Sequence, residues 1–138
     1  MKDVVEALRN SKKVFLGSKA DVHHNIDARK YLAEEGMAVF PDEFFSLVKY
    51  INGMRDDAAQ IYGILPEGND FGLEDAVREN ERLGRHDMDK VSVLGSTIFD
   101  YLVYDHTDKQ YQLRDRETDE ISECFSSLPQ ALRRIFKV

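Results

Sequence analysis

Residues 40–53, with the sequence FPDEFFSLVKYING, carry the strongest structural signal in this chain. Pro41 suits the first turn of a helix, because its missing N–H would have no partner there. An apolar stripe at helical spacing predicts the buried face of this helix, which consists of Phe44, Leu47, Val48 and Ile51. Asn52 and Gly53 predict its end, because glycine readily adopts the left-handed conformation of a C-terminal cap. We therefore expect a helix over Pro41–Asn52.

Helical spacing of apolar residues predicts three more helices in the first part of the chain. One lies at the start, one runs from about Asp21 to Glu35, and one ends near Gly84. Their predicted inward residues are Val4, Val5 and Leu8, then Ile26 and Leu32, then Leu73, Ala76, Val77 and Asn80. A strand is predicted over Ala59–Ile64, and the Pro, Gly and Asn residues of 65–70 predict a loop.

The periodicity changes to that of strands after residue 90. The predicted strands are Val91–Gly95, Phe99–Tyr104, Gln110–Arg114 and Glu120–Phe125. The strict alternation of Gln110–Arg114 predicts one buried side and one solvent-facing side. Ser127 predicts the cap of a last helix, with Gln130 three residues on. This order predicts an α+β fold in one domain, 1–138, with an antiparallel sheet meander flanked by helices that pack on one face.

The composition favours a cytoplasmic protein without membrane contact. The chain has 138 residues and one cysteine, Cys124, so no disulfide can form within it. No apolar run approaches the roughly 20 residues of a membrane-spanning helix. The first six residues already contain acids and do not resemble a signal peptide. Cys124 lies beside Phe125, which predicts a small buried residue rather than a nucleophile.

The net charge of −7 is concentrated in two segments. Residues 67–89 and residues 100–123 each contain eight acids and three bases, which gives −5 for each segment. This distribution argues against nucleic-acid binding, which needs a basic patch. It would steer association with a basic protein partner, although an ordinary solvated surface explains the same charges.

The order of several short motifs resembles the SUKH superfamily, over roughly residues 20–136. The residues that carry the resemblance are Pro41, Phe44, Leu47, Asn52, Gly53, Tyr62, Gly63 and Gly95. The hairpin strands after Gly95 and the apolar helix after Phe125 extend it. The chain departs from the family where a Leu-Gly pair is common before the proline, because Leu32 is followed here by Ala-Glu-Glu-Gly.

The resemblance implies a binding protein rather than an enzyme. The superfamily includes many bacterial toxin-immunity proteins and a yeast cell-wall synthesis regulator. It implies an immunity protein that binds and neutralises a cognate bacterial polymorphic toxin. The acidic segments suit a basic toxin domain, such as a nuclease. A regulatory or scaffold protein of the same fold without a toxin partner is the alternative. We expect a monomer or a weak homodimer.

The predicted partner-binding residues lie in the strand and turn that follow Gly95. They are Tyr104, Asp105, Asp108 and Asp100. Tyrosine is enriched at binding hot spots, although half-buried sheet packing also explains a tyrosine there. Asp105 and Asp108 lie in a predicted turn, where their charges would be outside the core.

No motif for a cofactor, metal or catalytic residue is present in the sequence. His23 and His24 are adjacent and would project about 100° apart from a helix, so they do not face one metal ion together. No histidine or cysteine pair has the spacing of a zinc site. The sequence therefore predicts no cofactor and leaves a small hydrolase as a remote alternative.

Overall fold

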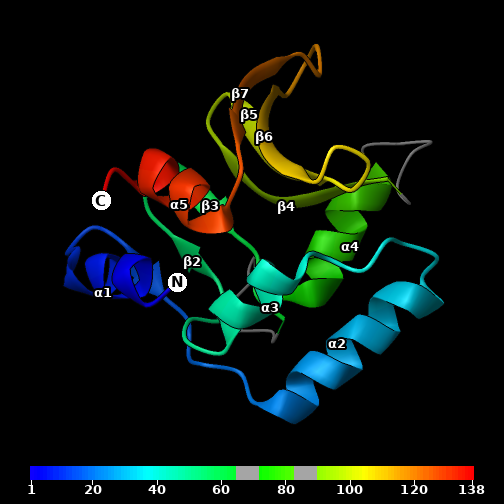
Figure 1. The fold of residues 1–138 in the computed structure, drawn as a ribbon, viewed down its shortest axis with the longest axis horizontal. Helices are drawn as coiled ribbons and strands as arrows, with labels where there is room; N and C mark the ends of the chain where they lie inside the picture. Colours follow the sequence, from blue (N-terminus) through cyan, green and yellow to red (C-terminus); the bar gives the residue numbers. More distant parts are fainter. Residues whose placement is uncertain (65–71, 83–89) are drawn as a thin grey trace.

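The computed structural model describes residues 1–64, 72–82 and 90–138, which form an α+β fold (Figure 1). The helices are α1 (Lys2–Asn10), α2 (Val22–Glu34), α3 (Asp42–Val48), α4 (Leu73–Arg82) and α5 (Leu128–Phe136). The strands are β1 (Phe15–Leu16), β2 (Met54–Arg55), β3 (Ala59–Ile61), β4 (Val91–Thr97), β5 (Asp100–Asp105), β6 (Gln110–Asp115) and β7 (Ile121–Phe125). The seven strands form one antiparallel sheet in chain order, so the predicted meander flanked by helices is confirmed. The predicted loop at 65–70 and helix end near Gly84 lie outside the described residues.

Helix α3 is shorter than predicted, because it ends at Val48 rather than at Asn52. Its predicted buried face is confirmed, since Phe44, Leu47, Val48 and Ile51 are each at most 1% exposed. Gly53 has φ +84°, as the predicted left-handed conformation requires. It serves the link to β2 rather than the helix end, and its carbonyl oxygen accepts the N–H of Gly17 at 2.9 Å.

Asn52 explains why a glycine stands at position 63. The side chain of Asn52 is fully buried, and its Oδ1 accepts the N–H of Ile64. A Cβ atom on Gly63 would collide with the Asn52 side chain and backbone. Beside this contact, the N–H of Tyr62 donates to the carbonyl oxygen of Leu94 at 3.0 Å. The Asn-Gly and Tyr-Gly motifs therefore hold together the end of the α3 region and the start of the sheet.

Helices cover both faces of the sheet, whereas we predicted one face. The pairing of β4 with β5 shifts register between Val93 and Gly95. The backbone N–H and C=O of Val93 bond to the side chain of Asn80 in α4. The N–H of Val93 donates to Asn80 Oδ1 at 2.9 Å, and Asn80 Nδ2 donates to the Val93 carbonyl at 3.2 Å. Tyr101 on the same face bonds Glu79 of α4, while its neighbour Leu102 points to the opposite face and joins the main core with α5.

The prediction for β6 is also wrong, because its residues are buried on both sides of the strand. Tyr111, Gln112, Leu113 and Arg114 are all buried, with Gln112 at 0% and Arg114 at 9% exposure. Gln112 and Arg114 occupy the side that we predicted to face solvent. They satisfy each other in part, since Arg114 Nε donates to Gln112 Oε1 at 2.8 Å. The alternating pattern of β6 therefore reflects one apolar and one polar side, and both sides are buried.

The start of α5 is fixed by three acceptors. Ser127 accepts the N–H of Gln130 at 3.4 Å, as its predicted cap role requires. Gln130 Oε1 accepts the N–H of Ser126 at 3.1 Å, one residue before the cap. Glu43 of α3 accepts the N–H of Leu128 at 3.0 Å. This last bond joins two helices that lie 85 residues apart in sequence.

Replacing Gly95 with alanine should lower the free energy of unfolding by about 1–3 kcal/mol, because overpacking forces backbone shifts. A Cβ atom there would overlap the carbonyl oxygen of Gln60 and lie 2.8 Å from Ile61 Cδ1. Denaturant unfolding measures the effect. The control is Ser96→Ala at the next, half-buried position, which should stay within about 0.5 kcal/mol of wild type. Equal stability of the Gly95→Ala and Ser96→Ala proteins would contradict the close strand approach.

Candidate functional site

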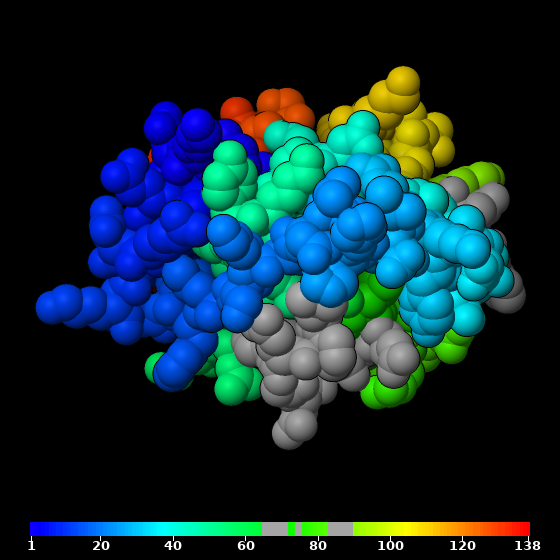
Figure 2. All heavy atoms as spheres, turned by 90° about the horizontal axis from the view of Figure 1, so that it is seen from below, coloured from blue at the N-terminus to red at the C-terminus, as the bar shows by residue number. Residues whose placement is uncertain are grey.

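Two hollows lie beside α3 and share two lining residues, and we call them together the α3 groove. The first lies between α2 and α3, and the second lies between the start of α3 and the β5–β6 hairpin. Their volumes are about 440 and 450 Å³, and both are lined by Arg29 and Asp42. Figure 2 shows α2 lying on the outer surface of the molecule, in light blue to cyan. The groove therefore runs from α2 to the hairpin along one side of α3.

An ion pair lies between the two hollows. Arg29 Nη2 is 3.1 Å from Asp42 Oδ1, and the guanidinium carbon lies 4.1 Å from the centre of the Phe45 ring. The Arg29 side chain is 41% exposed and that of Asp42 is 91% exposed. Exposed ion pairs contribute about 0–1 kcal/mol, so a partner can replace this one at little cost.

The α2 end of the groove combines exposed apolar groups with a buried amide. Asp21 caps α2 by accepting the N–H of His24 at 2.9 Å. Val22 and Ile26 are 60% and 57% exposed, so our prediction that Ile26 faces the core is wrong. Asn25 is 5% exposed, and its Nδ2 donates weakly to the Phe45 carbonyl at 3.5 Å. Asn25 Oδ1 is buried without a hydrogen-bond partner.

An unpartnered buried carbonyl oxygen costs free energy that a hydrogen bond would recover. The Asn25 side chain lines the first hollow, beside Val22 and Ile26. The Asn25 Oδ1 atom has almost no accessible surface, so the groups that this end offers to a ligand are the exposed side chains of Val22 and Ile26. This end of the groove can therefore contact apolar groups of a partner.

Tyr104 forms the wall of the other end. Its ring centre lies 4.9 Å from those of Tyr111 and His106. Burial raises the pKa of the Tyr104 hydroxyl, and the charges of Glu43, Asp105 and Asp42 raise it further. The hydroxyl therefore stays protonated and can donate a hydrogen bond in a negative local field. Such a half-buried tyrosine has the properties of an interface anchor.

The four predicted partner-binding residues do not form one site. Tyr104 faces the α3 groove, whereas Asp105 points to the opposite face of the sheet, because successive strand residues alternate. Asp105 is also not an exposed turn residue as predicted. Its side chain is 14% exposed, its Oδ2 lies 3.4 Å from Arg114 Nη2, and its Oδ1 accepts the N–H of Thr107 and of Asp108.

Asp108 and Asp100 lie at opposite ends of β5. Asp108 is exposed in the β5–β6 turn, as predicted. Asp100 is half-buried at the start of β5, where it is paired in register with Asp115. Burial raises the pKa of Asp100, and the charges of Asp115 and Glu123 add to this effect. Of the four residues, only Tyr104 lines the groove, and Asp108 lies near it.

One pair of side chains resembles hydrolase chemistry but is closed to a substrate. Ser92 Oγ lies 2.8 Å from His106 Nε2. Burial lowers the pKa of His106, which the charge of Asp105 opposes in part. Ser92 has no exposed surface, and the Asp105 carboxylate is held by Arg114 and the turn amides. The arrangement therefore stabilises the hairpin but does not present a nucleophile.

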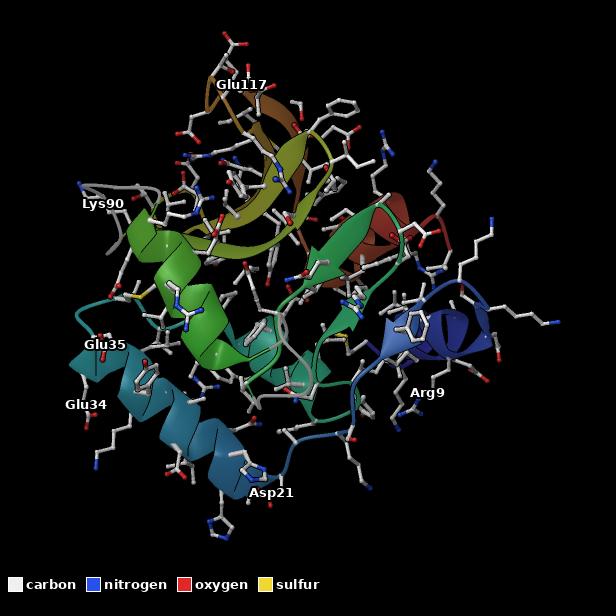
Figure 3. All side chains as sticks on the ribbon, turned by 180° about the vertical axis from the view of Figure 1, so that it is seen from behind. Arg9, Asp21, Glu34, Glu35, Lys90 and Glu117 are labelled. Carbon is white, nitrogen blue, oxygen red and sulfur yellow. The ribbon has the colours of Figure 1, made fainter. Side chains whose placement is uncertain are left out.

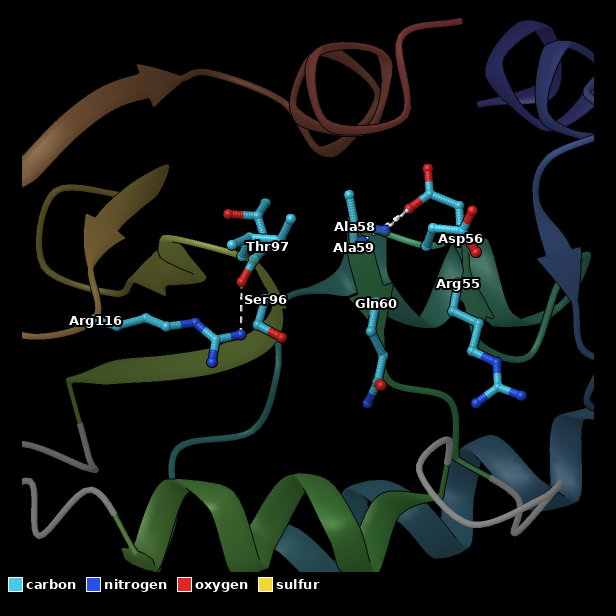
Figure 4. A pocket seen from close by; sticks show the side chains of 10 residues that line it. Arg55, Asp56, Ala58, Ala59, Gln60, Ser96, Thr97 and Arg116 are labelled. Atoms are coloured by element: carbon cyan, nitrogen blue, oxygen red, sulfur yellow. Dashed lines mark hydrogen bonds between the residues drawn. The ribbon is translucent and has the colours of Figure 1, made fainter.

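A third hollow lies on the opposite side of the sheet, at the ends of β2, β3 and β4 (Figure 4). Arg116 reaches into it from the β6–β7 turn and donates to the Thr97 carbonyl. Its guanidinium also lies 5.0 Å from the centre of the Tyr101 ring. Arg116 is thus held by intramolecular contacts.

The structure also places Cys124 and part of the acidic segment 67–89. Cys124 is exposed on β7, so the prediction of a buried residue is wrong. Of residues 67–89, only 72–82 are described, which leaves much of that acidic segment outside the structure.

Within the described ranges, no group of three or more His, Cys, Asp or Glu side chains could hold a metal ion. In the same ranges, no helix combines the length and apolar character needed to cross a membrane.

Comparisons with known proteins add no relative. No protein-family model matches the chain, and no curated protein matches it.

Proposed function

We propose that this chain is a non-catalytic binding module that neutralises a cognate bacterial polymorphic toxin. The observation that carries the proposal is the α3 groove, which extends from the exposed Val22 and Ile26 on α2 to the tyrosine wall at Tyr104. A polypeptide segment lying along α3 would contact the exposed apolar side chains at one end and the Tyr104 ring at the other. The immunity role comes from the motif order that resembles the SUKH superfamily.

Charge supports a basic partner, such as a nuclease domain. The chain has a net charge of −7, which would attract a positively charged toxin and raise the association rate. Inhibition would be steric, by covering the active site of the toxin, and an interface of roughly 1,600 Å² would suffice. The α3 groove would form one part of that surface.

The test screens any toxin domain encoded next to the gene for this chain and measures association and dissociation rates for matched variants. Tyr104→Ala should weaken binding by about 2 kcal/mol or more, chiefly through faster dissociation. Phe99→Ala is the control, because Phe99 is 74% exposed and lies outside the groove. Asp108→Lys should slow association at low salt only, since salt screens exposed charges over about 8–10 Å. Equal effects of Tyr104→Ala and Phe99→Ala would contradict the groove as the binding surface.

The same experiment separates the alternative function. If no neighbouring toxin binds, a regulatory or scaffold role with another protein partner replaces the immunity role. The Asp105 charge cannot serve in this test, because its reversal would disturb the buried contact with Arg114.

A further inference from the structure

Strand β7 is an open edge of the sheet. It pairs with β6 on one side and is the last strand of the order β1 to β7 in the described part of the chain. The opposite edge strand, β1, has two residues, whereas β7 has five. An unpaired edge presents backbone N–H and C=O groups that can pair with another chain. Proteins often block such an edge with proline or lysine, and β7 contains neither.

The side chains of β7 leave this edge accessible. Ser122 and Cys124 are exposed, and Ile121 is 51% exposed. Helix α5 packs against one face of β7, where Arg134 Nε lies 3.1 Å from Glu123 Oε1. The described contacts therefore cover a face of β7 but not its outer backbone edge.

The approach to the edge is negatively charged. Glu117 and Glu120 are exposed in the turn that leads into β7, and Figure 3 shows Glu117 at the tip of that turn. The one basic residue of this turn, Arg116, is folded back onto Thr97 and Tyr101. A strand that pairs with β7 would thus meet uncompensated acids at its end.

We propose that the β7 edge binds an extended basic segment of a protein partner as an eighth strand of the sheet. Backbone hydrogen bonds would supply affinity, and lysine or arginine side chains beside Glu117 and Glu120 would supply selectivity. A second copy of this chain fits less well. Pairing about the middle of β7 would set Glu123 opposite its own copy, and like charges directly opposite are destabilising.

The β7 edge is continuous with the α3 groove. Ser126 follows the last residue of β7 and lines the Tyr104 end of the groove. A partner segment that leaves β7 at Phe125 would therefore reach the groove directly. The inference deepens the proposed function, since it assigns a binding mode to the same partner, but its test needs no toxin.

The probe is a synthetic nine-residue peptide in which lysine alternates with valine or threonine. We expect it to slow hydrogen exchange of the outward-facing amides of residues 121–125, by about tenfold at ten times its dissociation constant. It should also slow reaction of a thiol reagent with Cys124, the one cysteine of the chain. A peptide with glutamate in place of lysine, and one with a central proline, should give no protection at the same concentration.

Charge variants test the selectivity. Glu117→Lys with Glu120→Lys should weaken binding of the lysine peptide at least tenfold at low salt. The matched control is Glu34→Lys with Glu35→Lys, two exposed acids at the end of α2 that should leave affinity unchanged (Figure 3).

Three results would overturn the inference. They are unchanged exchange at residues 121–125 with the lysine peptide, equal protection by the glutamate peptide, and a peptide-free dimer that protects these amides. Protection by the lysine peptide without binding of any neighbouring toxin would support the edge site and reject the immunity role. Binding of a neighbouring toxin without protection of the 121–125 amides would support the immunity role and reject the edge site.

Discussion

Replacing Arg114 with methionine is expected to lower the free energy of unfolding by about 3–5 kcal/mol. The Arg114 side chain is 11% exposed and lies 3.4 Å from Asp105 and 3.3 Å from Asp119. Methionine would leave the 14% exposed Asp105 carboxylate without its cation and Gln112 Oε1 without its donor. An uncompensated buried charge costs far more than a lost surface contact. Denaturant unfolding with an unchanged slope would measure the loss.

Arg134→Met is the matched control for this prediction. Arg134 pairs with Glu123 at 3.1 Å, but its side chain is 56% exposed. Its loss should cost less than about 1 kcal/mol, because exposed ion pairs contribute little. Asp105→Asn combined with Arg114→Met should recover part of the stability, since no buried carboxylate then remains at residue 105. Equal losses for Arg114→Met and Arg134→Met would show that the Arg114 cluster is not a buried ion pair.

The sequence predicted the elements whose signal is local. In α4, the residues Leu73, Ala76, Val77 and Asn80 all face inward, as their spacing required. The cap at Ser127 formed where the sequence placed it. Strands β1 and β2 were missed, because two residues carry no periodicity. They exist through pairing between residues such as Phe15 and Arg55, which are far apart in sequence.

The candidate site was less predictable, because it depends on which faces meet. Tyr104 and Asp105 are neighbours in sequence, but the strand sends them to opposite faces of the sheet. Asn25 and Arg29 of α2 join Tyr104 in the α3 groove only through the position of α3. No motif in α2 marked these two residues. The unpartnered Asn25 oxygen in particular is a property of packing and has no signal in the sequence.

The prediction that one side of β6 faces solvent was wrong for a related physical reason. Alternation shows that two faces differ, but it does not show that the polar face meets solvent. Gln112 and Arg114 are buried on that side, where they contact each other and Arg114 also contacts Asp105 and Asp119. Asp105 and Gln112 accept hydrogen bonds from Arg114, which allows Arg114 to be buried. Neither residue type indicates burial in the sequence.

Leu47→Ala is expected to lower the free energy of unfolding by about 2–5 kcal/mol. Leu47 is fully buried in α3, and its removal would leave a cavity beside Phe44 and Val48 in the main core. Helix α3 has seven residues, so it depends on this packing rather than on its own helix propensity. Chemical unfolding followed by circular dichroism measures the change.

The comparison variant is Ile26→Ala, because sequence periodicity predicted both side chains to face the core. The structure leaves Ile26 57% exposed on α2, so its truncation should change stability by less than about 0.5 kcal/mol. A large loss of stability for Leu47→Ala with a small loss for Ile26→Ala would agree with the structure, in which Leu47 of α3 is buried and Ile26 of α2 is exposed. Similar large losses at both positions would mean that the α2 side of the groove is packed, and that Ile26 is not available to a partner. The pair of variants thus tests the fold and the accessibility of the α3 groove together.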